Sequence, residues 1–188
     1  MSTPATQLFS GTYQAQPGAS TFAFAVRHSA TFWFRGAVPE VTATLRGDGD
    51  ELTLEGSARV DSISIVEPPA MRASVLGAAF FDAENHPEVS FRSTEIRLAD
   101  DGELELDGEL TIRGVTRPVS AGGRYSAPRP SDFGEIAGLE LQATIDRREW
   151  GFEWQAELPG GGDAVGWEVR LEIDLLLIRA DAEAAAAE

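Results

Sequence analysis

The segment ELELDGELTIR, residues 103–113, alternates polar and apolar side chains from end to end, with Gly108 standing in the apolar series. Successive side chains of a β-strand point to opposite faces, so the leucines and the isoleucine share one face and the acidic residues share the other. An antiparallel sheet with one dry and one wet face requires this pattern. The segment therefore predicts an amphipathic strand and an all-β fold.

The same alternation recurs along the rest of the chain. It predicts further strands at Thr21–His28, Glu51–Val60, Leu139–Asp146 and Val169–Ile178, and weaker ones at Gly11–Gln16, Val38–Arg46, Val89–Leu98 and Arg117–Tyr125. Between Phe91 and Ile96 the apolar residues change parity, which predicts a β-bulge.

Turn-forming residues separate these strands. Those at 47–50 and 100–102 predict hairpins, and those at 127–131 and 159–163 predict loops. A short helix is expected at residues 68–76, where proline stands at the tolerated first positions. A second helical turn is expected at 147–150, because Asp146 and Glu149 have the spacing of a capping box.

Eight or nine strands with short connections in one domain of 188 residues indicate a sandwich or a barrel. We favour a closed antiparallel barrel, because closure removes the exposed edges of the sheet. The expected divisions are an N-terminal segment at 1–10, the barrel domain at 11–179, and a frayed or disordered acidic, alanine-rich tail at 180–188.

Composition excludes several classes of function. A formal net charge of -16 repels phosphate backbones and anionic lipid surfaces, so we expect neither nucleic-acid binding nor peripheral membrane docking. With no cysteine and two histidines, a metal site is not expected. The absence of a long apolar run and of a leader pattern predicts no membrane span and a cytoplasmic location.

The sequence carries no known catalytic motif. The sequence contains no Gly-x-Ser-x-Gly elbow, no dinucleotide fingerprint and no phosphate-binding loop with its lysine. We therefore expect a protein that is not an enzyme, with no catalytic residues. An enzyme acting on a lipid-like substrate would need a perturbed titratable group inside the barrel, for which His28 is the one candidate.

Small residues interrupt the apolar faces of several expected strands. They are Gly56, Ala58, Gly108, Ala121 and Gly123. In one interpretation they leave an apolar tunnel, which an eight-stranded barrel is wide enough to offer to one slender ligand. In the other, the glycines allow the strands to bend and the core is filled.

Aromatic residues and a histidine stand near the expected strand ends. Trp150, Phe152 and Trp154 share parity and either line one end of a cavity or plug it. His28 ends the apolar face of its strand and is either a polar group at the barrel mouth or a satisfied structural histidine.

Four segments, in order, resemble the YceI-like family of polyisoprenoid-binding proteins. They are FAVRH at 24–28, FFDAENHPEVSFRS at 80–93, GELTIRGVTRPV at 108–119 and IDRREWG at 145–151. The similarity runs from about Tyr13 to Arg179. The family usually carries Arg-Asp-x-His-Leu before the aromatic pair, whereas residues 71–77 here read MRASVLG and lack the Asp and the His.

The resemblance implies an eight-stranded lipocalin-like barrel that holds a polyprenyl or isoprenoid-quinone chain. It also implies a homodimer, no catalytic activity and no cofactor other than the bound polyisoprenoid lipid. Strand parity then selects ligand-binding candidates: Phe22, Phe24, Val26, Leu54, Ala58, Phe91, Leu106, Leu110, Leu141, Ile173 and Leu175. Met71, Phe80 and Phe81 are expected to gate the mouth. The alternative is a structural or interaction barrel with a filled core and no ligand.

Overall fold

A computed structural model describes residues 8–49 and 51–180. Its strands are β1 (Gly11–Ala15), β2 (Thr21–His28), β3 (Phe32–Val38), β4 (Val41–Asp48), β5 (Glu51–Arg59), β6 (Glu88–Leu98), β7 (Glu103–Ile112), β8 (Val115–Ser131), β9 (Gly134–Asp146) and β10 (Val165–Arg179). The expected helix is α1 (Pro69–Leu76), and 3₁₀ turns lie at Val60–Ser62 and Arg147–Trp150. The side chain of Asp146 caps the second turn by accepting a hydrogen bond from the Arg148 amide.

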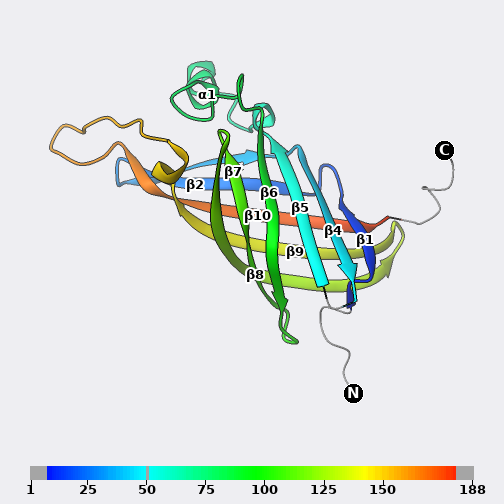
Figure 1. The fold of residues 1–188 in the computed structure, drawn as a ribbon. Coiled ribbons are helices and arrows are strands. Elements are labelled where there is room, and N and C mark those ends of the chain that lie inside the picture. The colour runs from blue at the N-terminus through cyan, green and yellow to red at the C-terminus, as the bar shows by residue number, and fades with distance from the viewer. Residues whose placement is uncertain (1–7, 50, 181–188) are drawn as a thin grey trace.

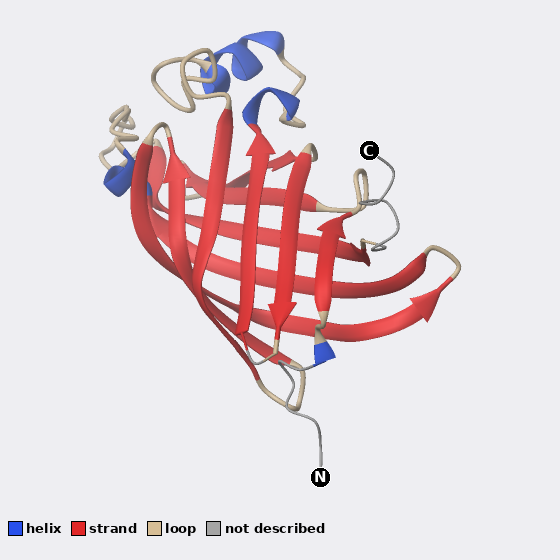
Figure 2. Cartoon of the chain, turned by 45° about the vertical axis from the view of Figure 1, so that its right-hand side comes forward, coloured by secondary structure: helices blue, strands red, loops and turns tan. Residues whose placement is uncertain are grey.

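The strands form one antiparallel sheet that closes on itself (Figure 1). In the described residues the closed ring has eight strands in the order β1-β4-β5-β6-β7-β8-β9-β10, and β10 pairs back to β1. The β2–β3 hairpin extends this wall, because β2 pairs with the first part of β10. The prediction of an eight-stranded antiparallel barrel is confirmed, and Figure 2 shows α1 lying over one end of it.

Two predicted element boundaries were wrong. The strand expected at 38–46 is the end of β3 plus most of β4, and β3 itself was not predicted. Pro39 separates the two strands, because proline has no N–H to donate to a β-ladder. The loop expected at 127–131 continues β8, since a register shift between Ser126 and Arg129 accommodates the prolines.

The bulge predicted in β6 is confirmed by a register shift between Ser93 and Glu95 in its pairing with β7. The buried core starts earlier than the expected domain boundary, because Phe9 is 1% exposed and packs edge-on against Tyr13 and Tyr125. The rest of the expected N-terminal segment, residues 1–7, and the expected tail from residue 181 lie outside the described residues. No described helix has the length and apolar character needed to cross a membrane.

The two sides of β3 are joined to the rest of the molecule in different ways. β3 pairs with β2 on one side. On its other side, in the described part of the chain, two hydrogen bonds join it to the segment before α1: Ser64 N–H donates to Ala37 O at 2.7 Å, and Ala37 N–H donates to Ser64 Oγ at 3.0 Å. We call this contact the β3 seam.

Candidate ligand-binding site

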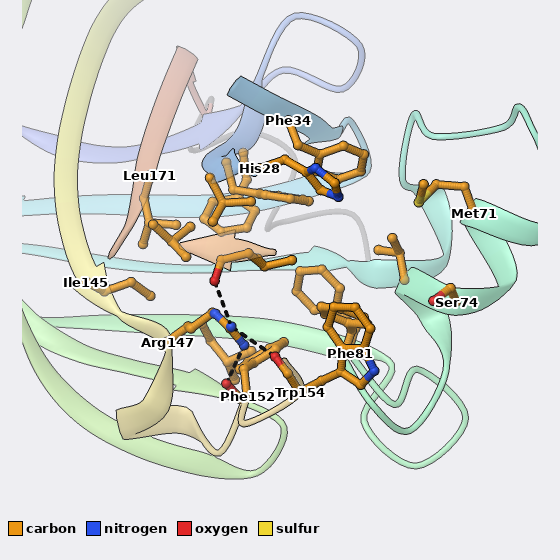
Figure 3. Close-up of a pocket in the computed structure, with 18 residues that line it drawn as sticks. His28, Phe34, Met71, Ser74, Phe81, Ile145, Arg147, Phe152, Trp154 and Leu171 are labelled. Atoms are coloured by element: carbon orange, nitrogen blue, oxygen red, sulfur yellow. Dashed lines mark hydrogen bonds between the residues drawn. The ribbon is translucent and has the colours of Figure 1, made fainter. Parts of the chain in front are cut away.

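The barrel encloses two apolar voids. The first has a volume of about 230 Å³ and lies at the end of the barrel that α1 covers (Figure 3). The second has a volume of about 90 Å³ and is surrounded by residues of the central strands. Phe22 and Leu171 contribute to the walls of both voids, so their side chains lie between the two.

Every residue predicted from strand parity or resemblance lies on one of these voids. The first void is lined by Phe22, Phe24, Val26, Met71, Phe80 and Phe81. The second is lined by Phe22, Leu54, Ala58, Phe91, Leu106, Leu110, Leu141, Ile173 and Leu175. The structure therefore brings the candidates together in the barrel interior, and their contact with a ligand stays a prediction.

The glycines bring neighbouring strands close together, while Gly56, Ala58 and Ala121 line the second void, so a tunnel along these small residues stays a prediction. A Cβ atom at Gly56 would lie 3.1 Å from the Thr42 carbonyl oxygen, and one at Gly123 would lie 3.0 Å from the Leu141 Cα. At Gly108 the space is filled by the ring of Phe91. These glycines allow neighbouring strands and side chains to approach closely, as the alternative interpretation expects.

Residues from α1 and from the segment after it form the mouth of the first void. Met71, Ser74 and Val75 of α1 line it, and Met71 is 38% exposed. Phe80 packs on Trp154 with ring centroids 5.4 Å apart. Met71 therefore lies at the surface, as a gating residue would, while Val75 closes the wall from inside.

Trp150, Phe152 and Trp154 divide between the two roles considered for them, plugging the interior or lining a cavity. Trp150 is a core residue, 1% exposed, and its Nε1–H donates to the Leu110 carbonyl at 3.1 Å. Phe152 and Trp154 line the first void, and Phe152 packs edge-on against Phe81. Trp150 thus plugs the interior and the other two surround the cavity.

Arg147 is the charged side chain on the wall of the first void, and it is 4% exposed. Its guanidinium donates to the carbonyls of Phe152 at 2.5 Å, Trp154 at 3.0 Å, Val165 at 3.2 Å and Gly166 at 2.8 Å. Burial lowers the pKa of Arg147 from its ordinary value, although an arginine still keeps its proton in a protein. The side chain therefore ties the segment 152–166 to the barrel and places a positive charge at the cavity.

Two further polar side chains lie on the same wall. The His28 ring stacks on Phe32 with centroids 5.0 Å apart, and its Nδ1 lies 3.0 Å from Ser29 Oγ. His28 therefore occupies the cavity wall, the position expected of a polar group at the barrel mouth. The second is Ser74 of α1.

Sequence reasoning missed several residues of the first void. Phe34 was not predicted as a site residue because β3 was not predicted. Phe32, Phe34 and Gly36 nevertheless have the spacing of one strand face. Val169 and Leu171 stand in the strand expected at Val169–Ile178 but are not among the ligand-binding candidates. Arg147 gave no periodic signal, because its partners are backbone carbonyls of a later segment.

A closed eight-stranded antiparallel barrel around an apolar cavity is the architecture of lipocalin-like binding proteins. The profile of the YceI-like domain matches residues 13–177. The chain therefore belongs to the YceI-like family, which confirms the resemblance seen in its motifs.

Individual relatives are distant in sequence. The UPF0312 protein of Staphylococcus aureus (strain USA300) is 24% identical over 157 residues, which cover 81% of this chain and 89% of that protein. BcnA of Burkholderia cenocepacia has a similar structure, with a TM-score of 0.71 at 18% identity, covering 86% of this chain and 98% of BcnA. A polyisoprenoid binding domain from Saccharophagus degradans, implicated in plant cell wall breakdown, gives a TM-score of 0.65 at 10% identity, covering 89% and 98%. The structural likenesses establish a shared fold.

Proposed function

We propose that this protein binds a long-chain isoprenoid lipid inside its barrel and carries or sequesters it without catalysing a reaction. The observation that carries the proposal is the apolar void of about 230 Å³ inside the barrel. Protein interiors rarely leave voids larger than a water molecule. An apolar cavity of about 150 Å³ already takes up small hydrocarbons, so the larger and mostly apolar first void suits an apolar ligand.

The identity of the ligand is supported by the family and by the shape of the interior. The chain is a YceI-like protein, and one protein of the same fold is described as polyisoprenoid binding. The two voids adjoin at Phe22 and Leu171, which line both of them. Rotation of these side chains would join the voids into one apolar channel, which suits a linear chain of isoprene units.

Burial of hydrocarbon supplies the binding energy. Each isoprene unit has five carbons, and removal of a CH₂ from water contributes about 0.8 kcal/mol. A few buried units therefore offset the estimated 4–15 kcal/mol that association costs. Affinity should depend mainly on the length of chain buried.

The proposal is tested by native mass spectrometry of the purified protein, followed by organic extraction and lipid analysis. We expect an adduct of several hundred daltons that the solvent removes and that contains isoprene units. A barrel that carries no adduct and takes up no added polyprenol or isoprenoid quinone would instead support the structural alternative.

We further propose, from the sequence and the family resemblance, a homodimer and a cytoplasmic location. Light scattering on the eluting protein tests the first, and cell fractionation tests the second. The ligand-binding proposal depends on neither.

A further inference from the structure

We propose that the first void selects apolar ligands that end in a negatively charged oxygen group, a carboxylate or a phosphate, and that Arg147 recognises this group. This inference rests on the proposed function and specifies the headgroup of its ligand. Figure 3 shows Arg147 reaching the cavity from the wall opposite α1, with its hydrogen bonds to other lining residues drawn as dashed lines.

Among the described residues Arg147 forms hydrogen bonds but no close ion pair, and Asp146 and Asp163 act on its charge only from a longer distance. Four of its five N–H groups are used, and all four acceptors are neutral backbone carbonyls. Among the described residues no carboxylate oxygen lies within 4.0 Å of it, and the adjacent Asp146 pairs with Arg148 instead. A buried charge is costly unless it is compensated. The Trp167 ring, whose centroid lies 4.2 Å from the guanidinium carbon, compensates part of the charge, and an anionic ligand group would add the close ionic partner.

The other side chains on the cavity wall also favour an anionic ligand group. In the described part of the chain, its remaining polar side chains are His28 and Ser74, and no aspartate or glutamate lines it. Both residues can donate hydrogen bonds. A cavity that is apolar except for a few convergent donors fixes the orientation of a ligand through its polar end, and an amine at that end would be repelled by Arg147.

Arg147 also has a structural role, because it ties residues 152–166 to the barrel. Its loss could loosen the cavity and weaken the binding of any ligand. The two roles differ in one measurable quantity, the ratio of affinities for ligands that share a chain and differ only in the headgroup. Loosening the cavity lowers all affinities together and leaves this ratio unchanged.

The experiment uses delipidated full-length protein and four probes with one fifteen-carbon chain: farnesoic acid, farnesyl phosphate, farnesol and farnesylamine. Competition against a fluorescent apolar probe gives each affinity. We expect the acid or the phosphate to bind at least tenfold more tightly than farnesol, and the amine to bind most weakly. Comparison of acid with phosphate identifies which anion the site prefers.

Arg147→Met is expected to bring the acid-to-alcohol ratio close to 1, and Arg147→Lys to retain part of the preference. The matched control is Arg113→Met, because Arg113 also donates to backbone carbonyls, those of Gly151 and Ala78, but does not line the cavity. This variant should keep the wild-type ratio.

Equal affinities for acid, phosphate and farnesol in the wild-type protein would overturn the headgroup inference and leave the proposed function intact. Failure of all four probes and of longer isoprenoids to bind would overturn the proposed function itself. If Arg147→Met does not fold, the wild-type ratio and the Arg147→Lys variant still decide the question.

Discussion

The ring of Phe91 on β6 lies where a side chain at position 108 of β7 would have to be. A Cβ atom built on Gly108 would be 2.6 Å from Cε2 of Phe91. On the other neighbouring strand, Phe91 stands opposite Gly56 of β5. An aromatic side chain laid over glycines of adjacent strands is a known device for stabilising a curved sheet. Phe91 and Gly108 thus form one packing unit in the barrel wall.

Gly108→Ala is therefore expected to lower the free energy of unfolding by about 1–3 kcal/mol, since an added methyl group in a packed core forces its neighbours to shift. Urea unfolding measures the change. Gly122→Ala on the adjacent β8 is the control, because nothing lies within 4 Å of a Cβ atom there. A Gly108→Ala variant as stable as Gly122→Ala would show that the Phe91 ring can move aside freely.

Leu171→Trp is expected to abolish lipid uptake while leaving the ligand-free protein at least as stable as the wild type. Leu171 lines both voids, so an indole there would occupy space that is empty without ligand. Thermal unfolding and lipid binding are measured on the same sample. Glu172→Trp, which places the same side chain on the exposed face of β10, should bind lipid normally. Full lipid uptake by Leu171→Trp would remove the region between the voids from the binding site.

Tyr13 should make the stability of the barrel fall at high pH. Its hydroxyl donates to Glu135 Oε1 at 2.6 Å, and burial, with help from Glu135, raises the pKa of Tyr13 to about 12. The unfolded value is about 10. Because the folded pKa is the higher one, the stabilisation is complete below about pH 10 and is lost as the pH rises through about 12.

The midpoint of thermal unfolding between pH 9 and 12 measures this loss, and Tyr13→Phe should flatten the profile over that range. The sequence has two tyrosines, so in a Tyr125→Phe variant the tyrosinate absorbance reports on Tyr13 alone. Ionisation of Tyr13 near pH 10 in the folded Tyr125→Phe variant would contradict the prediction.

Arg72 is expected to control how firmly α1 covers the cavity. Its guanidinium donates to the carbonyls of Asp61 at 2.6 Å and Ile63 at 2.8 Å, which hold α1 to the segment before it. Arg72→Met should destabilise this attachment by about 1–2 kcal/mol, a five- to thirtyfold change in local opening. Hydrogen exchange of residues 69–76 and the rate of lipid release measure it.

The control for this prediction is Arg92→Met, since Arg92 is an exposed residue of β6 that pairs with Glu55 on the barrel surface. Hydrogen exchange in α1 that is the same in both variants would show that other contacts hold the helix.

The sequence predicted those parts of the fold in which one face of a strand is dry and the other is wet. β2 was predicted with its observed limits, Thr21–His28, and β7 nearly so. β3 was missed because both of its faces are partly covered: Phe34 turns to the cavity, while Trp33 on the other face lies under the cations of Arg27 and Arg170. Such a strand does not alternate in hydropathy.

The candidate site was predictable only as a set of inward positions. Parity indicates which side chains face the interior, as it did for Leu106 and Ile173, but not how completely they fill it. The size of a void depends on how side chains from distant strands meet. The position of Arg147 depends on the path of residues 152–166, whose carbonyls it binds, and no local pattern encodes that path.

The β3 seam bears on the route by which cargo reaches the interior. Neighbouring strands such as β9 and β10 are joined by a long backbone ladder, whereas in the described part of the chain two hydrogen bonds between Ala37 and Ser64 join β3 to the segment before α1. Few hydrogen bonds must break to open the β3 seam. Phe34 and Met71, on its two sides, both border the first void. A flexible hydrocarbon chain could then enter sideways through the opened β3 seam. It would not have to enter end-first through the open end of the barrel.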